Sequence, residues 1–274
     1  MRYSFFGNRL VGTFSKKYCP QRKDNTWSIL SRWIHLQWGV SELPHPDKSG
    51  KGEDAYFVQD NAAGVFDGVG GWESKGVDPS LYPNELAKKT AEMVKLKGPC
   101  HVVEALEYAA QHTSAVGSST AAVVGYCKEK DRLVGLNLGD SGFLQIRNGT
   151  VLCRTTEQQH FFNCPFQLGT GSRNVVQDGE FIEWSLEIGD TLILGTDGLF
   201  DNMKMDELLE LIAEGDEAGQ SPSVLAHRIA QTAMEFSMDE NKTSPFAEMA
   251  NEAGFIFLGG KRDDITVIVG KVKE

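Results

Sequence analysis

The sequence predicts an α+β protein, a four-layer α-β-β-α sandwich with two central antiparallel sheets packed face to face and helices outside. Two observations support this fold class. Strand-like runs follow one another through short polar turns, which is the usual connection between antiparallel strands. Helical apolar periods occur in two separate groups, 84–97 with 101–113 and 205–213 with 223–236. Each group can cover the outer face of one sheet.

The first strands are expected soon after residue 35. Residues 36–50 fit a short strand followed by a loop that contains two prolines. Strands at 55–58 and 64–66 form a hairpin around a polar turn, which brings together the acidic residues on either side of it. The first helix should begin at Asn84, because Asn is an effective N-cap residue, and end near Lys97.

A meander of antiparallel strands should follow over 118–154. Its Asn148-Gly149 pair is a strong signal for a type I′ hairpin turn. Residues 155–180 show little periodicity and are expected to form a surface loop region. The apolar run 191–196 lacks alternation and predicts a strand that is buried on both faces. The closing strand is expected at 265–269.

Charge is unevenly distributed along the chain. The formal net charge of −11 argues against a general nucleic-acid binder, since such proteins usually show a basic stripe. Residues 1–35 nevertheless carry seven Lys or Arg and one Asp. Basic, acid-poor N-termini are typical of organelle transit peptides, and a basic disordered tail is the alternative. No apolar stretch approaches the length that would span a bilayer, so no transmembrane segment is expected.

The cysteines show no metal or disulfide pattern. They are odd in number, widely spaced and lack a Cys-x-x-Cys pair: Cys19, Cys100, Cys127, Cys153 and Cys164. This pattern predicts unpaired thiols without a disulfide or a zinc site, and it fits a reducing compartment.

The functional prediction centres on the stretch Val65-Phe66-Asp67-Gly68-Val69-Gly70-Gly71. A short apolar strand carries Asp67 at its end, and the following glycines allow a ligand to approach the backbone closely. Carboxylate and carbonyl oxygens suit Mg²⁺ or Mn²⁺, so the Asp67 side chain and the Gly68 carbonyl are candidate ligands. Alone, an Asp-Gly pair more often marks a turn.

Four further motifs also place acidic residues beside strand-like runs, an arrangement that independent turns would not require. They are Gly52-Glu53-Asp54, Gly139-Asp140-Ser141, Thr196-Asp197-Gly198-Leu199-Phe200-Asp201 and Arg262-Asp263-Asp264-Ile265. Because these motifs extend from residue 53 to residue 264, one site built from them implies one domain. Asp264 should point away from Asp263 on a regular strand, and it therefore receives only a supporting role.

In this order, the motifs resemble those of the metal-dependent protein phosphatases of type 2C, over residues from about 38 to 272. Stretches around Trp72, Asp78, His160 and Pro245 resemble the mitochondrial branch of that family, the homologs of the seventh type 2C phosphatase. The resemblance implies that 36–274 form a type 2C phosphatase domain. It also implies that 1–35 are a mitochondrial transit peptide and that the protein resides in the matrix.

The resemblance further implies a cofactor of two Mg²⁺ or Mn²⁺ ions per active site, with a weaker third. Ions roughly 3.5–4 Å apart can activate a water for in-line attack on phosphorus, so that no phospho-enzyme is required. Asp67, Asp197 and Asp263 would form the catalytic set. By the same resemblance, Asp67 would bridge both ions, and Gly68, Asp197 and Asp263 would each bind one of them. Glu53 and Asp54 would contact the ions through water, and Asp140 with Asp201 would bind the third ion.

Two departures from the family pattern concern the handling of phosphate. Val69 stands where many members have a His that can protonate the leaving oxygen, and Ser49 stands near the usual phosphate-binding Arg. Lys48 or Lys51 can replace that Arg only as a point charge without its bidentate fork. His160 is a further candidate for substrate binding, although a lone His is more often structural.

The function expected is therefore that of a metal-dependent protein serine/threonine phosphatase that acts on phosphoserine and phosphothreonine. Through the resemblance, its partners would be mitochondrial phosphoproteins, with enzymes of ubiquinone biosynthesis as one class, and a monomer is expected. Loss of the His and Arg positions leaves a catalytically weak scaffold as one alternative. A small-molecule phosphohydrolase, which would depend little on the loop 155–180, is the other.

Overall fold

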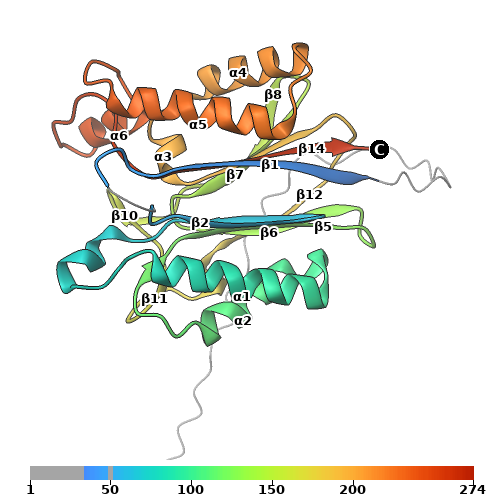
Figure 1. The fold of residues 1–274 in the computed structure, drawn as a ribbon, viewed down its shortest axis with the longest axis horizontal. Coiled ribbons are helices and arrows are strands. Elements are labelled where there is room, and N and C mark those ends of the chain that lie inside the picture. Colours follow the sequence, from blue (N-terminus) through green and yellow to red (C-terminus); the bar gives the residue numbers. More distant parts are fainter. Residues whose placement is uncertain (1–33, 49–51) are drawn as a thin grey trace, which may run out of the picture.

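A computed structural model describes residues 34–48 and 52–274 of the chain. Two five-stranded antiparallel sheets lie face to face, and helices cover both outer faces (Figure 1). The predicted α-β-β-α sandwich is therefore confirmed. Almost all of the proposed transit peptide, together with Ser49 and Lys51, lies outside the described residues.

The two sheets are built from distant parts of the chain. In spatial order, the first sheet contains β1 (His35–Leu43), β14 (Ile265–Lys273), β13 (Thr191–Gly195), β7 (Gly142–Arg147) and β8 (Thr150–Arg154). The second contains β12 (Glu180–Trp184), β6 (Arg132–Leu138), β5 (Ala121–Cys127), β3 (Ala62–Phe66) and β2 (Ala55–Gln59). The pairing of β1 with β14 places the first and last described strands side by side.

Each sheet has its own pair of covering helices (Figure 1). The second sheet packs against α1 (Leu81–Lys97) and α2 (Val102–His112), and the first against α4 (Met205–Glu217) and α5 (Pro222–Met238). The shorter elements are η1 (Gly70–Lys75), β4 (Ser118–Ser119), β9 (Gln159–Phe161), β10 (Cys164–Pro165), β11 (Leu168–Gly169), η3 (Val176–Asp178), α3 (Asp197–Phe200) and α6 (Pro245–Glu252). None of the helices in residues 34–48 and 52–274 has both the length and the apolar character of a membrane-spanning segment.

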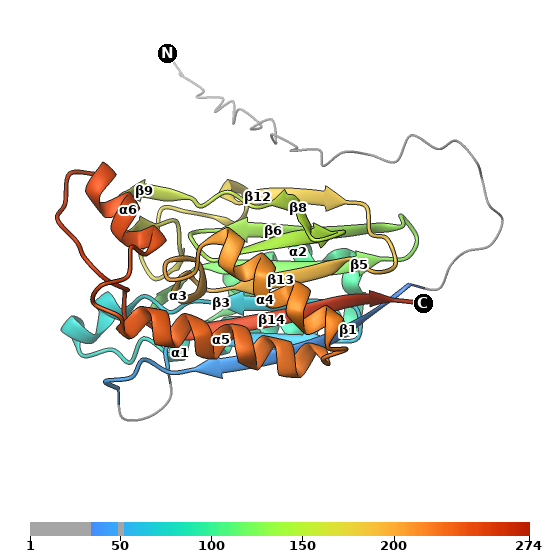
Figure 2. The same ribbon diagram turned by 90° about the horizontal axis from the view of Figure 1, so that it is seen from above.

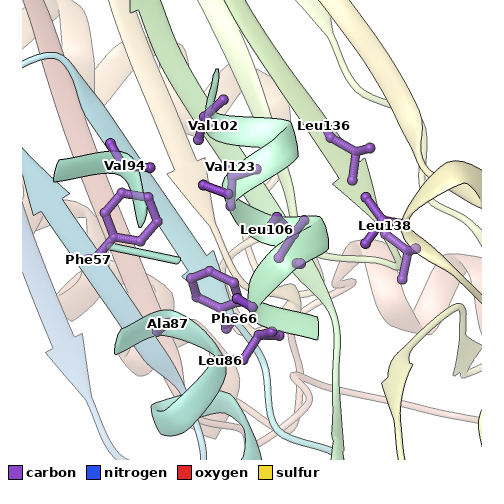
Figure 3. Close-up of a cluster of buried hydrophobic side chains, with 14 of the residues drawn as sticks. Phe57, Phe66, Leu86, Ala87, Val94, Val102, Leu106, Val123, Leu136 and Leu138 are labelled. Carbon is purple, nitrogen blue, oxygen red and sulfur yellow. The ribbon is translucent and has the colours of Figure 1, made fainter. Parts of the chain in front are cut away.

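Three apolar layers hold the sandwich together. Val65 and Phe143 lie in the layer between the two sheets, and Ile229 lies in the layer between the first sheet and α5. Phe66 and Leu106 lie in the third layer, between the second sheet and its helices (Figure 3). Because successive strand side chains point to opposite faces, β3 contributes to two layers at once. This double anchoring fixes the strand end that precedes residue 67.

Several element boundaries differ from the sequence prediction. Helix α1 begins at Leu81 and not at Asn84. Pro83 is tolerated in its first turn, where a backbone N–H would have no helical acceptor. The prediction of a surface loop over 155–180 is wrong in part, because β9, β10, β11 and η3 lie there. These elements are only two or three residues long, and β11 pairs with the distant β4, so they leave no local periodicity.

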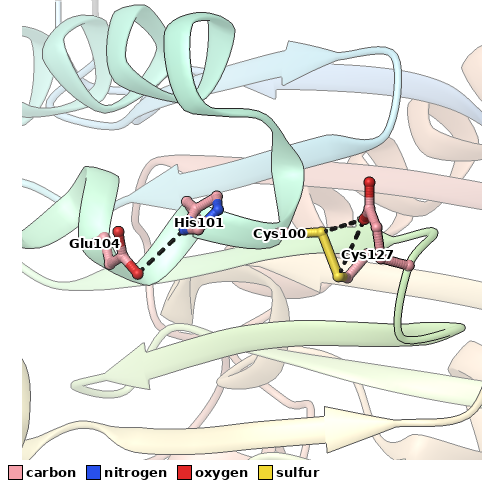
Figure 4. Close-up of a disulfide and its surroundings, with 5 residues drawn as sticks. Cys100, His101, Glu104 and Cys127 are labelled. Carbon is pink, nitrogen blue, oxygen red and sulfur yellow. Dashed lines mark hydrogen bonds and ion pairs between the residues drawn. A yellow bond between two sulfur atoms is a disulfide. The ribbon is translucent and has the colours of Figure 1, made fainter.

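Cys100 and Cys127 form a disulfide, and the prediction of unpaired thiols is wrong for these two residues (Figure 4). They are 27 positions apart, so no local motif reveals the pair. The 3₁₀ turn η2 (Pro99–His101) crosses β5 so closely that a Cβ on Gly125 would lie 2.1 Å from the Pro99 carbonyl oxygen. The Cα atoms of the two cysteines are consequently 4.4 Å apart. This crosslink removes the support that the cysteines gave to a reducing compartment.

Candidate metal centre

Three aspartates from distant parts of the chain meet at one point. Asp67 follows β3, Asp140 lies in the turn between β6 and β7, and Asp197 is the first residue of α3. One carboxylate oxygen from each residue lies within 4.8 Å of the others. The structure therefore brings together three of the residues that the sequence predicts to be metal ligands.

Hydroxyl groups hold Asp67 and the turn of Asp140 in register. The Asp67 N–H donates to Thr120 Oγ1 at 3.1 Å, and that oxygen lies 2.7 Å from Ser141 Oγ. The Thr120 N–H in turn donates to the Asp67 carbonyl oxygen at 2.9 Å. Thr120 therefore links the end of β3 to the turn that carries Asp140.

Close packing of α3 against β14 positions Asp197. A Cβ on Gly198 would lie 2.0 Å from the Asp264 carbonyl oxygen, so only glycine allows this approach. The Thr196 N–H donates to the Thr266 carbonyl oxygen at 3.1 Å and extends the contact between β13 and β14. The acidic motif after β13 and the one before β14 consequently lie together.

Lys261 contacts three of the acidic side chains. Its Nζ lies 2.5 Å from Asp197 Oδ2, 2.7 Å from Asp201 Oδ2 and 3.1 Å from Asp263 Oδ2. Burial opposes the charged form of this ammonium, but the three carboxylates outweigh that effect and raise its pKa well above the usual value. The acidic motifs alone gave no role to Lys261, and the available signal was its place two residues before Asp263.

Glu53 and Asp54 immediately precede β2, whose pairing with β3 brings them beside Asp67. Thr196 Oγ1 donates to Asp54 Oδ2 at 2.8 Å. The two oxygens of Asp264 accept from backbone N–H groups, that of His45 at 2.6 Å and that of Glu53 at 2.9 Å. Asp264 thus fixes the loops around the site, which agrees with the supporting role predicted for it.

The crowded carboxylates bind protons more tightly than isolated ones. Burial, followed by the nearby negative charges, raises the pKa of Asp67 and of Asp140 well above the usual range. Burial also raises the pKa of Asp54 well above that range, against the hydrogen bonds it accepts. Burial, together with the charge of Asp197, raises the pKa of Asp201 and of Asp263 to about 7.

The residues present fit a hard divalent cation. Oδ1 of Asp140 and Oδ1 of Asp54 are buried, and neither has a hydrogen-bond partner within the described part of the chain. Leaving a buried carboxylate oxygen unpaired is unfavourable, and such oxygens are the ligands that Mg²⁺ and Mn²⁺ prefer. A cation among these aspartates would satisfy the oxygens and remove the mutual repulsion.

Of the two lysines predicted to bind phosphate, the structure describes only Lys48. Lys48 forms an ion pair with Glu53 and lies 3.7 Å from Asp264 Oδ2, so carboxylates already engage its charge. Lys51 lies outside the described residues. Gly68, the candidate carbonyl ligand, forms an isolated antiparallel bridge with Ser119.

His160, the further candidate for substrate binding, contacts residues of its own loop region. It lies on β9, is exposed, and has Nε2 3.0 Å from Asn174 Oδ1. Its ring packs against that of Phe166 with the centroids 4.4 Å apart. Both partners belong to the same loop region, and a role of His160 in substrate binding stays a prediction.

Comparison with known proteins identifies the family. The family model described as Stage II sporulation protein E matches residues 62–273. "Probable protein phosphatase 2C 55" of Arabidopsis thaliana is 39% identical over 262 residues, covering 92% of this chain and 56% of that protein. "Protein phosphatase PTC7 homolog" of Homo sapiens is 38% identical over 247 residues, covering 81% of this chain and 80% of that protein. The chain thus spans little more than half of the plant relative.

Solved structures show the same architecture. The X-ray structure of the photosystem II phosphatase PBCP has a TM-score of 0.79 and 33% identity, covering 87% of this chain and 99% of that chain. The catalytic domain of the serine threonine protein phosphatase PstP, in complex with 2 manganese ions, has a TM-score of 0.64 at 15% identity, covering 88% and 100%. The sequence relatives and the shared fold lead to one conclusion: the chain belongs to the protein phosphatase 2C family.

Proposed function

We propose that this protein is a Mg²⁺- or Mn²⁺-dependent protein phosphatase that hydrolyses phosphoserine and phosphothreonine. The observation that carries the proposal is the convergence of Asp67, Asp140 and Asp197, with oxygens within 4.8 Å of one another. Bound divalent ions would neutralise these carboxylates, shield the phosphate and lower the pKa of an attacking water. Membership of the family supports the same chemistry.

The chain's own residues would present deprotonated oxygens in fixed positions. Thr120 and Ser141 hold Asp67 beside the turn that carries Asp140. Thr196 orients Asp54 through a hydrogen bond. We assign two ions and a weaker third to one shared set of ligands. That set is Asp67, Gly68, Asp197, Asp263, Asp140, Glu53 and Asp54, of which Asp67, Asp197 and Asp263 are the catalytic set.

Phosphate release from a phosphothreonine peptide tests the proposal, measured with Mn²⁺, with Mg²⁺ and with chelator. Turnover that requires a divalent ion supports it. Metal binding without phosphate release under any condition would favour the scaffold alternative. Val69 and Ser49 would explain that result, because they stand in place of the usual proton-donating His and near the usual phosphate-binding Arg. A strong preference for free phosphoesters over phosphopeptides would favour the small-molecule phosphohydrolase.

Lys261→Met should destabilise the metal-free protein and strengthen metal binding. Three carboxylates lose the ammonium that lies 2.5 to 3.1 Å from them. The unfolding free energy in chelator should fall by about 1.5–3 kcal/mol, the usual value of a hydrogen bond to a charged group. Mn²⁺ can supply the missing charge, so its dissociation constant should decrease. Denaturant unfolding in chelator and a Mn²⁺ titration measure both effects.

Lys204→Met is the matched control for this variant. Lys204 forms a surface ion pair with Glu248 at 2.7 Å, and solvent screens such pairs, so its loss should leave the unfolding free energy almost unchanged. Mn²⁺ affinity should not change. Weaker Mn²⁺ binding by Lys261→Met would contradict the view that the ammonium and the ion compete for the same carboxylates.

The metal-free protein should lose stability as pH rises from about 4 to about 7. Burial and the charge of Asp197 raise the pKa of Asp201 and of Asp263 to about 7 in the folded protein. The pKa of an Asp in an unfolded chain is about 3.9. Between these values the folded state binds more protons, so the unfolding free energy falls as pH increases. Mn²⁺ competes with the same protons, and its affinity should therefore rise over this interval. Melting curves in chelator across the interval check the sign, and Asp263→Asn should make the dependence shallower.

We also propose that residues 1–35 are a mitochondrial transit peptide and that 36–274 act in the matrix as a monomeric phosphatase domain. The seven basic residues of this segment and the similarity to the human PTC7 homolog support this assignment. Matrix phosphoproteins, with enzymes of ubiquinone biosynthesis among them, are the proposed substrates. Import of a fluorescent protein fused to residues 1–35 tests the location, and cytosolic retention would overturn it.

A further inference from the structure

Four large apolar side chains lie exposed on two neighbouring segments. Phe161 on β9 is 70% exposed, and the segment after α6 contributes Phe255, Ile256 and Leu258, exposed by 58%, 93% and 78%. We name these four residues the rim patch. Single exposed apolar residues are ordinary, whereas several large ones on segments that pack together point to an interaction surface.

Packed aromatic rings beneath the rim patch join its two segments. The ring of Phe162 lies 5.4 Å from that of Phe255 and 5.2 Å from that of Phe246, measured between centroids. The ring of Phe246 in turn meets that of Phe257 edge-on at 4.8 Å. Figure 2 shows β9 and α6 together at one end of the molecule. The patch therefore rests on a packed base.

The base of the rim patch touches the candidate metal centre. Lys261 Nζ, which pairs with the acidic residues, lies 5.0 Å from the centroid of the Phe246 ring. The Phe246 N–H donates to the Asp201 carbonyl oxygen at 3.0 Å. A single aromatic side chain thus separates the carboxylate cluster from the exposed apolar surface.

We infer that the rim patch binds apolar side chains that flank the phosphorylated residue of a protein substrate. The inference rests on the proposed phosphatase function. A phosphate held at the carboxylates brings the adjoining chain across the rim, since an extended chain advances about 3.3–3.6 Å per residue. Large apolar residues a few positions from the phosphoresidue can then cover the rim patch.

The charge of the surroundings favours this occupant over others. The segment Phe255–Leu258 is uncharged, while the protein as a whole carries a net charge of −11. An anionic membrane surface or a nucleic acid would be repelled by that charge. A free phosphoester that fits at the carboxylates would not extend to the patch. A second copy of the chain is the rival occupant, and the experiment distinguishes it.

The test uses the full chain with Ile256→Ser and Leu258→Ser combined. Two phosphothreonine peptides of equal length and charge are compared. One has Leu and Ile a few positions from the phosphothreonine, and the other has Ser and Gly at the same positions. The double variant should raise KM for the apolar peptide about 10- to 100-fold, as expected for losing one or two apolar contacts. Values for the polar peptide and for p-nitrophenyl phosphate should not change. Leu96→Ser, which is also 78% exposed but lies on α1 in the opposite helical layer, is the matched control and should leave all three substrates unaffected.

A binding measurement separates this inference from the proposed function. Fluorescence anisotropy of the labelled apolar peptide should give a Kd about 10- to 100-fold higher for the double variant, whether or not the peptide is hydrolysed. Absence of turnover on every substrate, with this difference in Kd retained, would overturn the phosphatase proposal and keep the docking surface. Equal KM and equal Kd for wild type and double variant would overturn the docking surface. A change of oligomeric state in sedimentation, with peptide binding unchanged, would assign the rim patch to self-association and likewise overturn it.

Discussion

Asp67→Asn is expected to remove metal-dependent turnover while the protein stays folded. Replacing residues that merely support metal ligands costs about 10- to 100-fold, so loss of a direct ligand should lower kcat/KM by more than about 100-fold. The neutral amide also removes an unfavourable buried negative charge, since burial and then the charges of Asp197 and other carboxylates raise the pKa of Asp67. In chelator, the variant should therefore melt at a higher temperature than the wild type. Phosphate release with Mn²⁺ and melting in chelator provide the two measurements.

Asp60→Asn is the control for this exchange. Asp60 is exposed in the turn between β2 and β3, on the same hairpin as Asp67, and its replacement should alter neither turnover nor melting. If Asp67→Asn retained full Mn²⁺-dependent turnover, the proposed metal centre would be wrong at its central ligand. An unfolded variant would be recognised by its melting curve, and Asp140→Asn then repeats the test at a second ligand.

Phe66→Ala is expected to lower the unfolding free energy by about 3–5 kcal/mol, the usual loss for a buried Phe. Phe66 is fully buried and its ring centroid lies 6.1 Å from that of Phe57, in the layer that also contains Leu86 and Leu106 (Figure 3). The cavity would also loosen the strand end that carries the following carboxylate, so Mn²⁺ affinity should fall. Denaturant unfolding and a Mn²⁺ titration measure the two effects.

Tyr56→Ala tests whether the loss comes from burial. Tyr56 lies on β2 and is 38% exposed, so its removal should change the unfolding free energy by less than about 1 kcal/mol. Similar losses for both variants would mean that strand propensity, and not the apolar layer, stabilises this hairpin.

The ends of strands were the most predictable part of the site. An apolar run followed by Asp identifies a carboxylate at a strand end, and this pattern located Asp67 and Asp197 without any knowledge of which strands pair. The fold class followed from the same periodicities. Family resemblance, and not spacing, supplied the expected ligand roles.

Features that depend on contacts between distant segments were not predictable. The Cys100–Cys127 bond requires η2 to cross β5, and the contacts of Lys261 require α3 to lie against β14. Neither arrangement leaves a trace in local composition. The rim patch was missed for the same reason, because the segments of Phe162 and Phe255, distant in sequence, meet only through their packed rings.

The pairing of β1 with β14 has a consequence for the kinetics of folding. His35 lies opposite Lys273, so this pair closes a loop that contains nearly the whole described chain. Contacts of such high sequence separation form slowly, because the entropy of loop closure is lost before the contact can compensate for it. Asp264, at the start of β14, also fixes the loops of His45 and Glu53. During synthesis, Asp264 can therefore reach the loops of His45 and Glu53 only after β14 has left the ribosome, and we expect the proposed metal centre to be completed late in folding.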